Sequence, residues 1–312
     1  MEHDSDVVVI GNAGIDTNVY LHGRNIDFTV ESNFTENLDY VGQAGGYASR
    51  GYASLGHRTA HIGFVGDDHS GRMVRDAFSR DRIDTTALFS DPAGTARSVN
   101  IMYKDGRRKN FYDGKSHMDL EPDLEACRTV LEGAVLAHFN IPNWARQLLP
   151  AAKELGLTIA CDIQDISSTD DPYRQDFIEY ADILFFSGSN LEDPGPQILD
   201  FQKVNPEQII VIGMGERGCA LANKDGIEYF PAVEMTQPVI DTNGAGDSLA
   251  VGFLASFVLD GRPAAESIWR GQIAARHACT LRANSSALVT REQLDDYVRD
   301  LERSRLEPQS GN

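Results

Sequence analysis

Short apolar runs alternate with longer segments of helical periodicity along most of the chain. The apolar runs are DVVVIG, HIGFVG, AVLAHF, LTIACD, DILFFS and QIIVIG, which begin at residues 6, 61, 134, 157, 182 and 208. Segments with helical spacing lie between them, over residues 45–55, 71–82, 144–155 and 172–180. Apolar strands that alternate with helices are typical of a parallel sheet covered on both faces and joined by right-handed crossovers. The pattern therefore predicts an α/β fold with a doubly wound, mostly parallel central sheet.

Three parts of the chain depart from this alternation. The last third has a mostly helical pattern, over residues 244–259, 263–282 and 290–303, and the polar tail 307–312 is expected to be disordered. Residues 17–43 and 95–117 instead alternate polar and apolar positions with period two. The second of these segments carries a DG turn, Asp105 and Gly106, which predicts a hairpin.

The two segments of period two are predicted to form a lid. Each leaves the central sheet at the carboxyl end of a strand and returns to it, so we expect them to pair into a small separate β-sheet. The ligand crevice of an open α/β sheet lies at that edge, where a small sheet is placed to close over it. The remaining ranges, 1–16, 44–94 and 118–306, are predicted to form the core that binds nucleotide and substrate.

Composition and charge exclude several classes of partner. Asp and Glu total 47 against 28 Lys and Arg, a formal net charge of −19, so we expect no nucleic-acid partner. No apolar run reaches the length of a membrane span, and the acidic start MEHDSDVVVIGN does not resemble a signal peptide. We therefore expect no membrane partner and a cytoplasmic location. The four cysteines have neither CxxC spacing nor a nearby histidine, so no structural zinc is expected.

The segment DTNGAGDSLAVGFL, residues 241–254, carries the strongest chemical signal. Gly244, Ala245 and Gly246 leave the backbone open to a ligand just before an apolar helix. The first N–H groups of a helix are unpaired and carry partial positive charge, so this terminus suits a phosphate or an oxyanion. Asp247 follows directly, and a simple helix cap would not need the two glycines. We interpret Asp247 as a base that takes the proton of a hydroxyl attacking the phosphate.

This segment closely resembles the signature of the ribokinase-like (PfkB) carbohydrate kinases, and the order of elements is similar throughout the chain. The resemblance implies that ATP, with Mg²⁺, phosphorylates a hydroxyl of a sugar or sugar-like substrate. It implies Asp247 as the catalytic base and Gly244, Ala245 and Gly246 as the anion hole. It also implies that Thr242 and Asn243 line the nucleotide site and that Asp241 lies beside a monovalent cation such as K⁺.

Two further matches imply the acceptor site. In GNAGIDTNV, Asp16 follows the first strand, where two carboxylate oxygens can hold two adjacent hydroxyls, with Asn12 assisting; a loop acid capping its own turn is the alternative. The segment GQAGGYASRGYASLG, residues 42–56, resembles the first signature of the family, with Gln43 in place of a usual glycine and Tyr47 in place of the usual asparagine. The Tyr47 ring is suited to stack on a sugar or a base. The glycines expected to contact the acceptor are Gly42, Gly45 and Gly46.

The donor side is implied by position. In VIGMGERGCAL, Gly213, Gly215 and Gly218 are expected to line the nucleotide site, although a plain hairpin turn is the alternative. The family usually has Asn-x-x-Glu after the strand DILFFS, and SGSNLED here offers Ser187 and Asn190, with Glu192 and Asp193 slightly later. Either of these acids helps to order Mg²⁺, or the phosphates alone carry the metal. Asp162, at the end of LTIACD, is a further polar contact or a cap.

Basic residues of the predicted lid receive two interpretations. Arg107, Arg108 and Lys109 are interpreted as a solvated turn. Arg97 shares a strand face with Val99 and Ile101, and some phosphosugar kinases of the family use an arginine there. We expect Arg97 to face the crevice.

Several alternatives stay open at this point. Tyr47, with Phe111 and Tyr112 in the lid, suggests a nucleoside kinase, while the changes at Gln43, Tyr47 and Ser187 suggest a non-catalytic sugar or nucleotide sensor. The exposed edges of the lid strands require cover. Pairing of two lids across a two-fold axis provides it, so we expect a homodimer through the lid.

Overall fold

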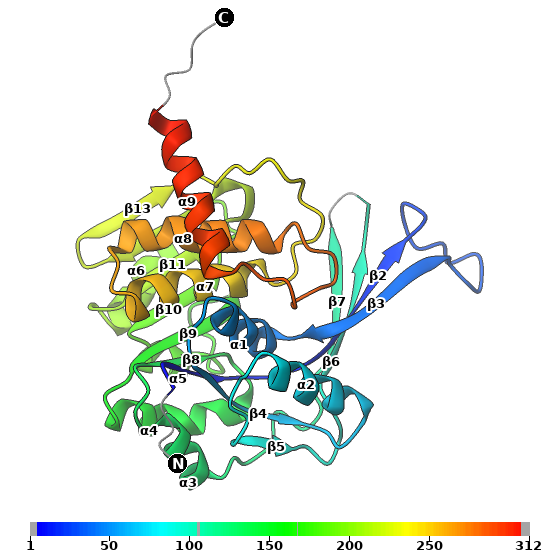
Figure 1. Cartoon of the computed structure of the whole chain (residues 1–312), viewed down its shortest axis with the longest axis horizontal. Helices are drawn as coiled ribbons and strands as arrows, with labels where there is room; N and C mark the ends of the chain where they lie inside the picture. The colour runs from blue at the N-terminus through cyan, green and yellow to red at the C-terminus, as the bar shows by residue number, and fades with distance from the viewer. Residues whose placement is uncertain (1–4, 105–106, 167, 307–312) are drawn as a thin grey trace, which may run out of the picture.

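The computed structural model describes residues 5–104, 107–166 and 168–306. The predicted tail 307–312 and the turn residues Asp105 and Gly106 lie outside this part. The described chain forms two sheets, one of nine strands in the order β13-β12-β11-β10-β9-β8-β1-β4-β5 and one of four in the order β3-β2-β6-β7 (Figure 1). This arrangement confirms the predicted α/β class with a large, mostly parallel sheet and a smaller one.

Six strands of the large sheet coincide with the six apolar runs of the sequence, whereas β5 and β13 were not predicted. The parallel strands are β1 (Val7–Ile10), β4 (Thr59–Val65), β5 (Leu88–Ser90), β8 (Leu136–Phe139), β9 (Thr158–Asp165), β10 (Ile183–Ser187) and β11 (Ile209–Gly213). At one edge β12 (Cys219–Asn223) and β13 (Gly226–Phe230) continue antiparallel. Every residue of β1, β4 and β8 is buried, as strands covered on both faces require.

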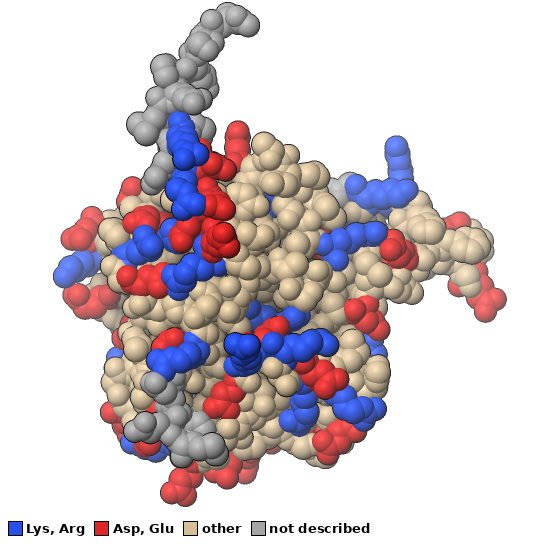
Figure 2. Space-filling view, viewed as in Figure 1, with Lys and Arg blue, Asp and Glu red and all other residues tan. Residues whose placement is uncertain are grey.

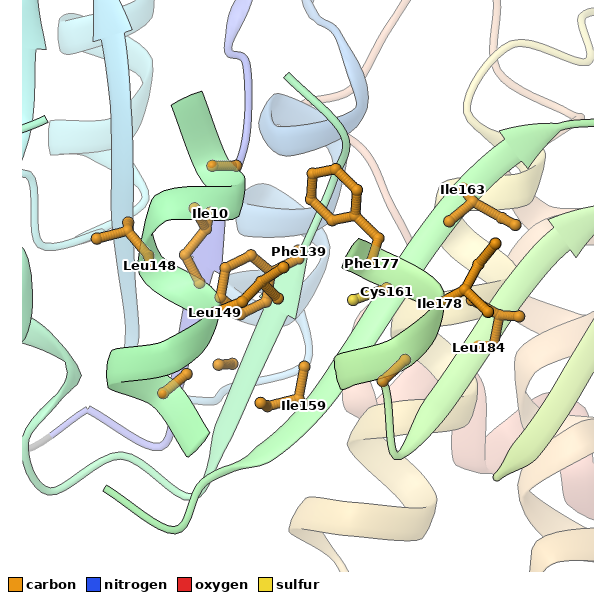
Figure 3. Close-up of a cluster of buried hydrophobic side chains, with 14 of the residues drawn as sticks. Ile10, Phe139, Leu148, Leu149, Ile159, Cys161, Ile163, Phe177, Ile178 and Leu184 are labelled. Atoms are coloured by element: carbon orange, nitrogen blue, oxygen red, sulfur yellow. The ribbon is translucent and has the colours of Figure 1, made fainter. Parts of the chain in front are cut away.

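Helices cover both faces of this sheet. On one face pack α1 (Ala44–Ser54), α7 (Ala245–Leu254), α8 (Ala264–Ala278) and the start of α9 (Arg291–Leu306). On the other lie α3 (Leu124–Leu131), α4 (Leu149–Glu154), α5 (Gln175–Tyr180) and α6 (Gly195–Val204). Figure 3 shows the second cluster, in which Phe139 from β8 packs between α4 and α5. The predicted helix over 172–180 begins only at Gln175, and α3 and α6 were missed by the periodicity.

The small sheet is built from the two segments of period two. It contains β2 (Gly14–Leu21), β3 (Thr35–Gly42), β6 (Arg97–Met102) and β7 (Arg108–Asp113). Parallel pairing of β2 with β6 joins the two segments, and the sheet projects from the core at the right of Figure 1. Because β2 begins at Gly14, residues 14–16 belong to this sheet and not to the core to which the pattern assigned them. The helix α2 (His69–Arg80) packs where the two sheets meet.

The surface and the helices carry two further findings. On the face drawn in Figure 2, Lys and Arg side chains are interspersed with Asp and Glu. Among the described residues, no helix combines the length and the apolar character needed to cross a bilayer.

Candidate active site

The N-terminus of α7 presents the predicted anion-binding turn. Its first residue outside the helix is Gly244, with φ 73°, and a Cβ at this position would collide with the ring of Tyr47. Only glycine satisfies both constraints. The Ser248 N–H bonds to the Gly244 carbonyl at 2.9 Å and the Ala245 N–H bonds to the Thr242 carbonyl at 3.3 Å, so the candidate free donors of this turn are the N–H groups of Gly244 and Gly246. Asp247 lies in this first turn, where its half-buried side chain is next to the unpaired N–H groups.

Asp247 lies within electrostatic range of two more aspartates. Burial, followed by the charges of Asp162 and Asp16, raises the pKa of Asp247 well above the ordinary range, while the Arg108 guanidinium opposes this rise. Burial also raises the pKa of Asp162, which lies within β9 three residues before its end and accepts the Gln164 N–H at 2.9 Å. Asp247, the predicted base, and Asp162, predicted to be either a polar contact or a cap, therefore lie close enough to influence each other's ionisation.

Asp16 is held between the two sheets. Its Oδ1 accepts a hydrogen bond from Gln43 Nε2 at 2.6 Å, and its Oδ2 accepts the Gln43 backbone N–H at 3.3 Å. A Cβ at Gly42 would collide with the Asp16 carboxylate, so glycine is needed for this approach. Burial raises the pKa of Asp16 to about 6, against the lowering effect of the Gln43 hydrogen bonds and of Arg108. The structure thus brings the predicted acceptor residues Asp16, Gly42 and Gln43 together.

The glycine-rich loop continues from this contact toward the first strand. Gly45 lies so close to the backbone carbonyl of Asn12 that a Cβ would come within 2.7 Å of it, whereas Gly46 has more room. Asn12 itself donates a hydrogen bond to the Tyr112 hydroxyl at 2.5 Å, which links the loop after β1 to the small sheet.

The inner face of the small sheet is a network of amides and hydroxyls. Asn110 donates to Asn100 Oδ1 at 2.8 Å, Asn100 donates to Asn18 Oδ1 at 3.0 Å, and Asn243 beside the anion turn donates to the same Asn18 oxygen at 3.0 Å. Ser98 accepts from Gln43 Nε2 at 2.9 Å. Alternate positions of each strand therefore face the site with polar groups. The alternation of side chains along β6 and β7 could have predicted these polar residues from the sequence.

Arg97 does not join this group. The prediction placed it on the crevice face, but the residues of β6 that face the site are Ser98 and Asn100, and alternation turns Arg97 to the opposite face. There its guanidinium donates to Thr17 Oγ1 at 2.9 Å and pairs with Asp39 at 3.6 Å, and 44% of the side chain is exposed. Val99 and Ile101, which share a face of β6 with Arg97, therefore lie on the outer face of the small sheet and not on the face toward the crevice.

Tyr47 is also placed differently from the prediction. Its side chain is only 4% exposed, packs under Gly244, and donates to the Tyr40 hydroxyl at 3.1 Å with the two rings edge to face. The ring supports the anion turn from below and offers no open face for stacking on a sugar or a base. The large side chain that replaces the usual asparagine is explained by this packing.

Arg108 is a functional candidate that the sequence interpretation missed. Its guanidinium bonds to Asn243 Oδ1 and lowers the pKa of both Asp16 and Asp247. Arg108 is exposed, as the interpretation of a solvated turn expects, but it begins β7 and its guanidinium also contacts the candidate site. Its cross-strand partner is Met102, which lies on the inner face of the small sheet, so Arg108 lies on that face too. Strand alternation in the sequence could have predicted this placement.

Asn140 is a second missed residue. It follows β8 at the carboxyl edge of the sheet, is 2% exposed, and neither its Nδ2 nor its Oδ1 has a hydrogen-bond partner. A Cβ at Gly11, at the end of β1, would collide with the Asn140 oxygen. A buried amide without partners is costly unless a ligand or water bonds to it, so Asn140 belongs to the candidate site.

The predicted nucleotide residues line the carboxyl ends of β10 and β11. Gly213 ends β11, and Gly215 and Gly218 flank the turn to β12, so they also form the hairpin turn that was the alternative. Ser187 ends β10, and Arg217 fixes the loop that contains Asn190 by donating to three carbonyls, those of Gly188, Leu191 and Glu192. Beside this loop is a cavity of about 510 Å³. It is lined by Glu192, Asp193, Pro194, Met214, Arg217 and Tyr229, among others.

Asp241 and Glu192 are the residues that the sequence predicts beside a metal ion. Asp241 Oδ2 accepts from Asn18 Nδ2 at 2.6 Å and from Tyr20 Oη at 2.9 Å, and Oδ1 accepts the Asn243 N–H at 2.9 Å. The place of Asp241 beside a monovalent cation stays a prediction. Within the described residues no group of three acidic, histidine or cysteine side chains could hold a metal. Glu192 lines the cavity beside the loop after β10. Mg²⁺ commonly binds through phosphates and water with few protein ligands, and its binding with the nucleotide stays a prediction here.

Together, the doubly wound sheet, the small sheet over its carboxyl edge and the aspartate at a glycine-bounded helix N-terminus define a sugar kinase of ribokinase-like fold. The family model described as pfkB family carbohydrate kinase matches residues 4–291, and the chain belongs to this family. The predicted family membership, fold and enzyme class are confirmed.

Relatives and solved structures agree over nearly the whole chain. The acarbose 7(IV)-phosphotransferase of Actinoplanes sp. is 28% identical, covering 94% of this chain and 98% of the relative. The 5-dehydro-2-deoxygluconokinase of Geobacillus thermodenitrificans is 24% identical, covering 96% and 95%. A microbiome-derived acarbose kinase, Mak1, superposes with a TM-score of 0.87 at 28% identity, covering 95% and 99%. Arabidopsis thaliana ribokinase complexed with ribose and ATP gives 0.80 at 19% identity, also covering 95% and 99%, which shows the fold.

The raised pKa of Asp247 predicts a pH-dependent cost in stability. Between the ordinary pKa of 3.8 and the folded value, the unfolded chain loses a proton that the native state keeps, so this group lowers stability as pH rises. Asp247→Asn should therefore raise the free energy of unfolding at both pH values. The gain should be larger at pH 8 than at pH 5, by on the order of 1 to 3 kcal/mol. Urea denaturation at both pH values measures this. The exposed Asp67→Asn is the control, and an equal gain for both variants would contradict the assignment.

Proposed function

We propose that this enzyme transfers the γ-phosphoryl group of ATP to a hydroxyl of a neutral, polyhydroxylated sugar. The observation that carries the proposal is the position of Asp247 in the first turn of α7, next to free N–H groups and within electrostatic range of Asp16. An anion hole, a base and a hydroxyl-binding carboxylate are the groups that such a transfer requires.

The acceptor is proposed to be neutral because of the charges around Asp16. The inner face of the small sheet offers amides and hydroxyls, which recognise sugar hydroxyls as donors and acceptors. Asp16, Asp162 and Asp247 repel an anionic acceptor, and Arg97, the arginine considered for a phosphosugar, pairs with Asp39 on the other face. One relative is named for acarbose and another for a gluconate derivative, and the local charge favours the uncharged class.

In the proposed mechanism the chain's own groups position the reactants and move one proton. Asp16 and Asn140 hold acceptor hydroxyls, and Asp247 takes the proton of the attacking one. An elevated pKa suits this task because a base is most effective when its pKa lies near the working pH. The N–H groups of Gly244, Ala245 and Gly246 receive the oxygens of the transferred group. Mg²⁺, when bound with the nucleotide, neutralises phosphate charge.

The donor is proposed to extend from the anion turn toward the cavity beside β11. Neighbouring strands lie ~4.8 Å apart, so β9, which carries Asp162, and β11 are separated by about 10 Å, a distance that a triphosphate chain spans. Thr242 and Asn243 would border the phosphates. Ser187, Asn190, Gly213, Gly215 and Gly218 would border the rest of the nucleotide, with the base in the cavity.

Two other functions are weighed against this proposal. The suggestion of a nucleoside kinase rested on Tyr47, Phe111 and Tyr112. The Tyr47 ring is buried under Gly244, whereas Phe111 and Tyr112 are exposed on β7, so this alternative now rests on the two lid aromatics. A non-catalytic sensor would not need the aspartate at the anion turn. Release of ADP with a sugar panel separates the sensor from the kinase, and nucleosides in the same panel separate the acceptor classes.

Asp247→Ala tests the proposed base. Turnover should fall by at least ~10³-fold, since both the proton acceptor and its orientation are lost, while ATP affinity should stay within a few fold. ADP release and calorimetric titration with ATP measure the two quantities. Asp67→Ala serves as the control. Turnover within tenfold of the wild type would remove Asp247 from the proposed role.

The acidic limb of the pH profile tests the surroundings of Asp247. The base acts when ionised, so kcat/KM should fall as pH drops through its pKa. Arg108 lowers that pKa and Asp162 raises it, so Arg108→Gln should move the limb to higher pH and Asp162→Asn to lower pH. Lys109→Gln, with the same change of charge on the other face of β7, should leave it in place. Shifts in the same direction for the first two variants would contradict the proposed cluster.

A homodimer through the lid is part of the proposal. Phe28 and Phe34, in the loop between β2 and β3, are 89% and 86% exposed and require cover. Sedimentation velocity should show a dimer that Phe28→Ser with Phe34→Ser weakens at least tenfold, whereas Leu199→Ser on α6 does not. A monomeric wild type, or a dimer indifferent to the lid variant, would exclude this interface. A cytoplasmic location is also proposed, and cell fractionation tests it.

A further inference from the structure

Gln43 has a backbone conformation that side chains other than glycine seldom adopt. It immediately precedes α1, with φ 64° and ψ 159°. These angles lie outside the left-handed helical region, where Asn and Asp are tolerated, and in a region that is essentially restricted to glycine. The chain has glycine at the neighbouring positions Gly42, Gly45 and Gly46, yet has glutamine at the most strained one. Strain of this kind persists when the side chain makes contacts that compensate for it.

Those contacts all converge on Asp16 and the small sheet. Gln43 Nε2 donates to Asp16 Oδ1 at 2.6 Å and to Ser98 Oγ at 2.9 Å, and the Gln43 N–H donates to Asp16 Oδ2 at 3.3 Å. A single residue thus bonds to both oxygens of the carboxylate and ties them to β6. A carboxylate accepts and an amide nitrogen donates, so the orientation of the Gln43 amide follows from its partner.

The remaining polar atom of the side chain is its carbonyl oxygen. Both hydrogens of Nε2 are used by Asp16 and Ser98, and within the described chain no hydrogen bond occupies Gln43 Oε1. The Gln43 side chain is half-buried, so it is accessible from the site. Gln43 Nε2 therefore occupies Asp16 Oδ1 as a hydrogen-bond acceptor, and Gln43 Oε1, in the same amide, offers a sugar hydroxyl another acceptor nearby.

We propose that Gln43 determines acceptor specificity by this exchange of accepting positions. The enzyme selects sugars whose adjacent hydroxyls reach Asp16 Oδ2 and Gln43 Oε1, and it disfavours sugars that need both oxygens of Asp16. The inference rests on the proposed function, because it assigns Asp16 to the acceptor.

The variants Gln43→Gly and Gln43→Ala test the proposal. Both remove the amide, so affinity for the best wild-type sugar should fall about tenfold or more, and the ranking of a sugar panel should change in the same way for both. ATP affinity should change less than twofold. Only glycine relieves the backbone, so Gln43→Gly should melt at least ~1 °C above Gln43→Ala, the reverse of the usual order. Calorimetric titration and thermal unfolding give these values.

Arg82, remote from the site, provides the matched control. It also has a positive φ, 58°, and is exposed. Arg82→Gly should melt above Arg82→Ala, with sugar affinities unchanged. Unchanged sugar ranking in both Gln43 variants would overturn the proposal, whether affinity is retained or falls equally for all sugars. The titration does not need turnover, so a wild type that binds sugars but releases no ADP would refute the proposed kinase while leaving the Gln43 result readable.

Discussion

The candidate site depends on three carboxyl groups that are held close together at one point of the sheet edge. Asp16, Asp162 and Asp247 come from three different segments, and burial together with their mutual repulsion raises the pKa of Asp247. Such a cluster destabilises the fold at neutral pH, because carboxyl groups kept from ionising cost free energy. The N-terminus of α7, the amides around Asp16 and the Arg108 guanidinium are the local groups that offset it. This combination is expected of a site that must hold a proton acceptor close to phosphate.

The small sheet is connected to this charge cluster by hydrogen bonds and not only by packing. Asn18 donates to Asp241 and accepts from Asn243, so a strand of the small sheet bonds to both ends of the turn that precedes α7. Arg108 reaches the same Asn243 from β7. Movement of the small sheet would therefore alter the anion turn directly. That link gives a physical basis for coupling acceptor enclosure to assembly of the phosphoryl site.

Much of this architecture was predictable from the sequence, for identifiable reasons. Apolar runs of β-branched residues predicted most strands of the large sheet, and the glycines before Asp247 predicted a tight turn at the start of a helix, because both signals are local. The errors came from contacts between distant segments. Arg97 and Arg108 lie on opposite faces of one sheet, and only the pairing of β6 with β2 decides which face meets the core. Tyr47 was misjudged because its packing against Gly244 joins positions almost two hundred residues apart.

The same limit explains why Asn140 and Gln43 were undervalued. An asparagine after a strand is common in sequences, and only burial without partners marks it as exceptional. The glutamine could be recognised as a departure from the family pattern, but its backbone angles and its hold on both Asp16 oxygens required coordinates. Residues at such sites violate local rules because neighbouring groups compensate for them.

The central claim is that phosphoryl transfer occurs at the N-terminus of α7. A crystal structure with ADP, Mg²⁺, aluminium fluoride and a sugar identified from the panel tests it most directly. The account predicts the fluoride group on the N–H groups of Gly244 to Gly246, with the sugar oxygen in line and within ~3 Å of Asp247. A fluoride group bound elsewhere, or a sugar oxygen out of hydrogen-bond reach of Asp247, would contradict it.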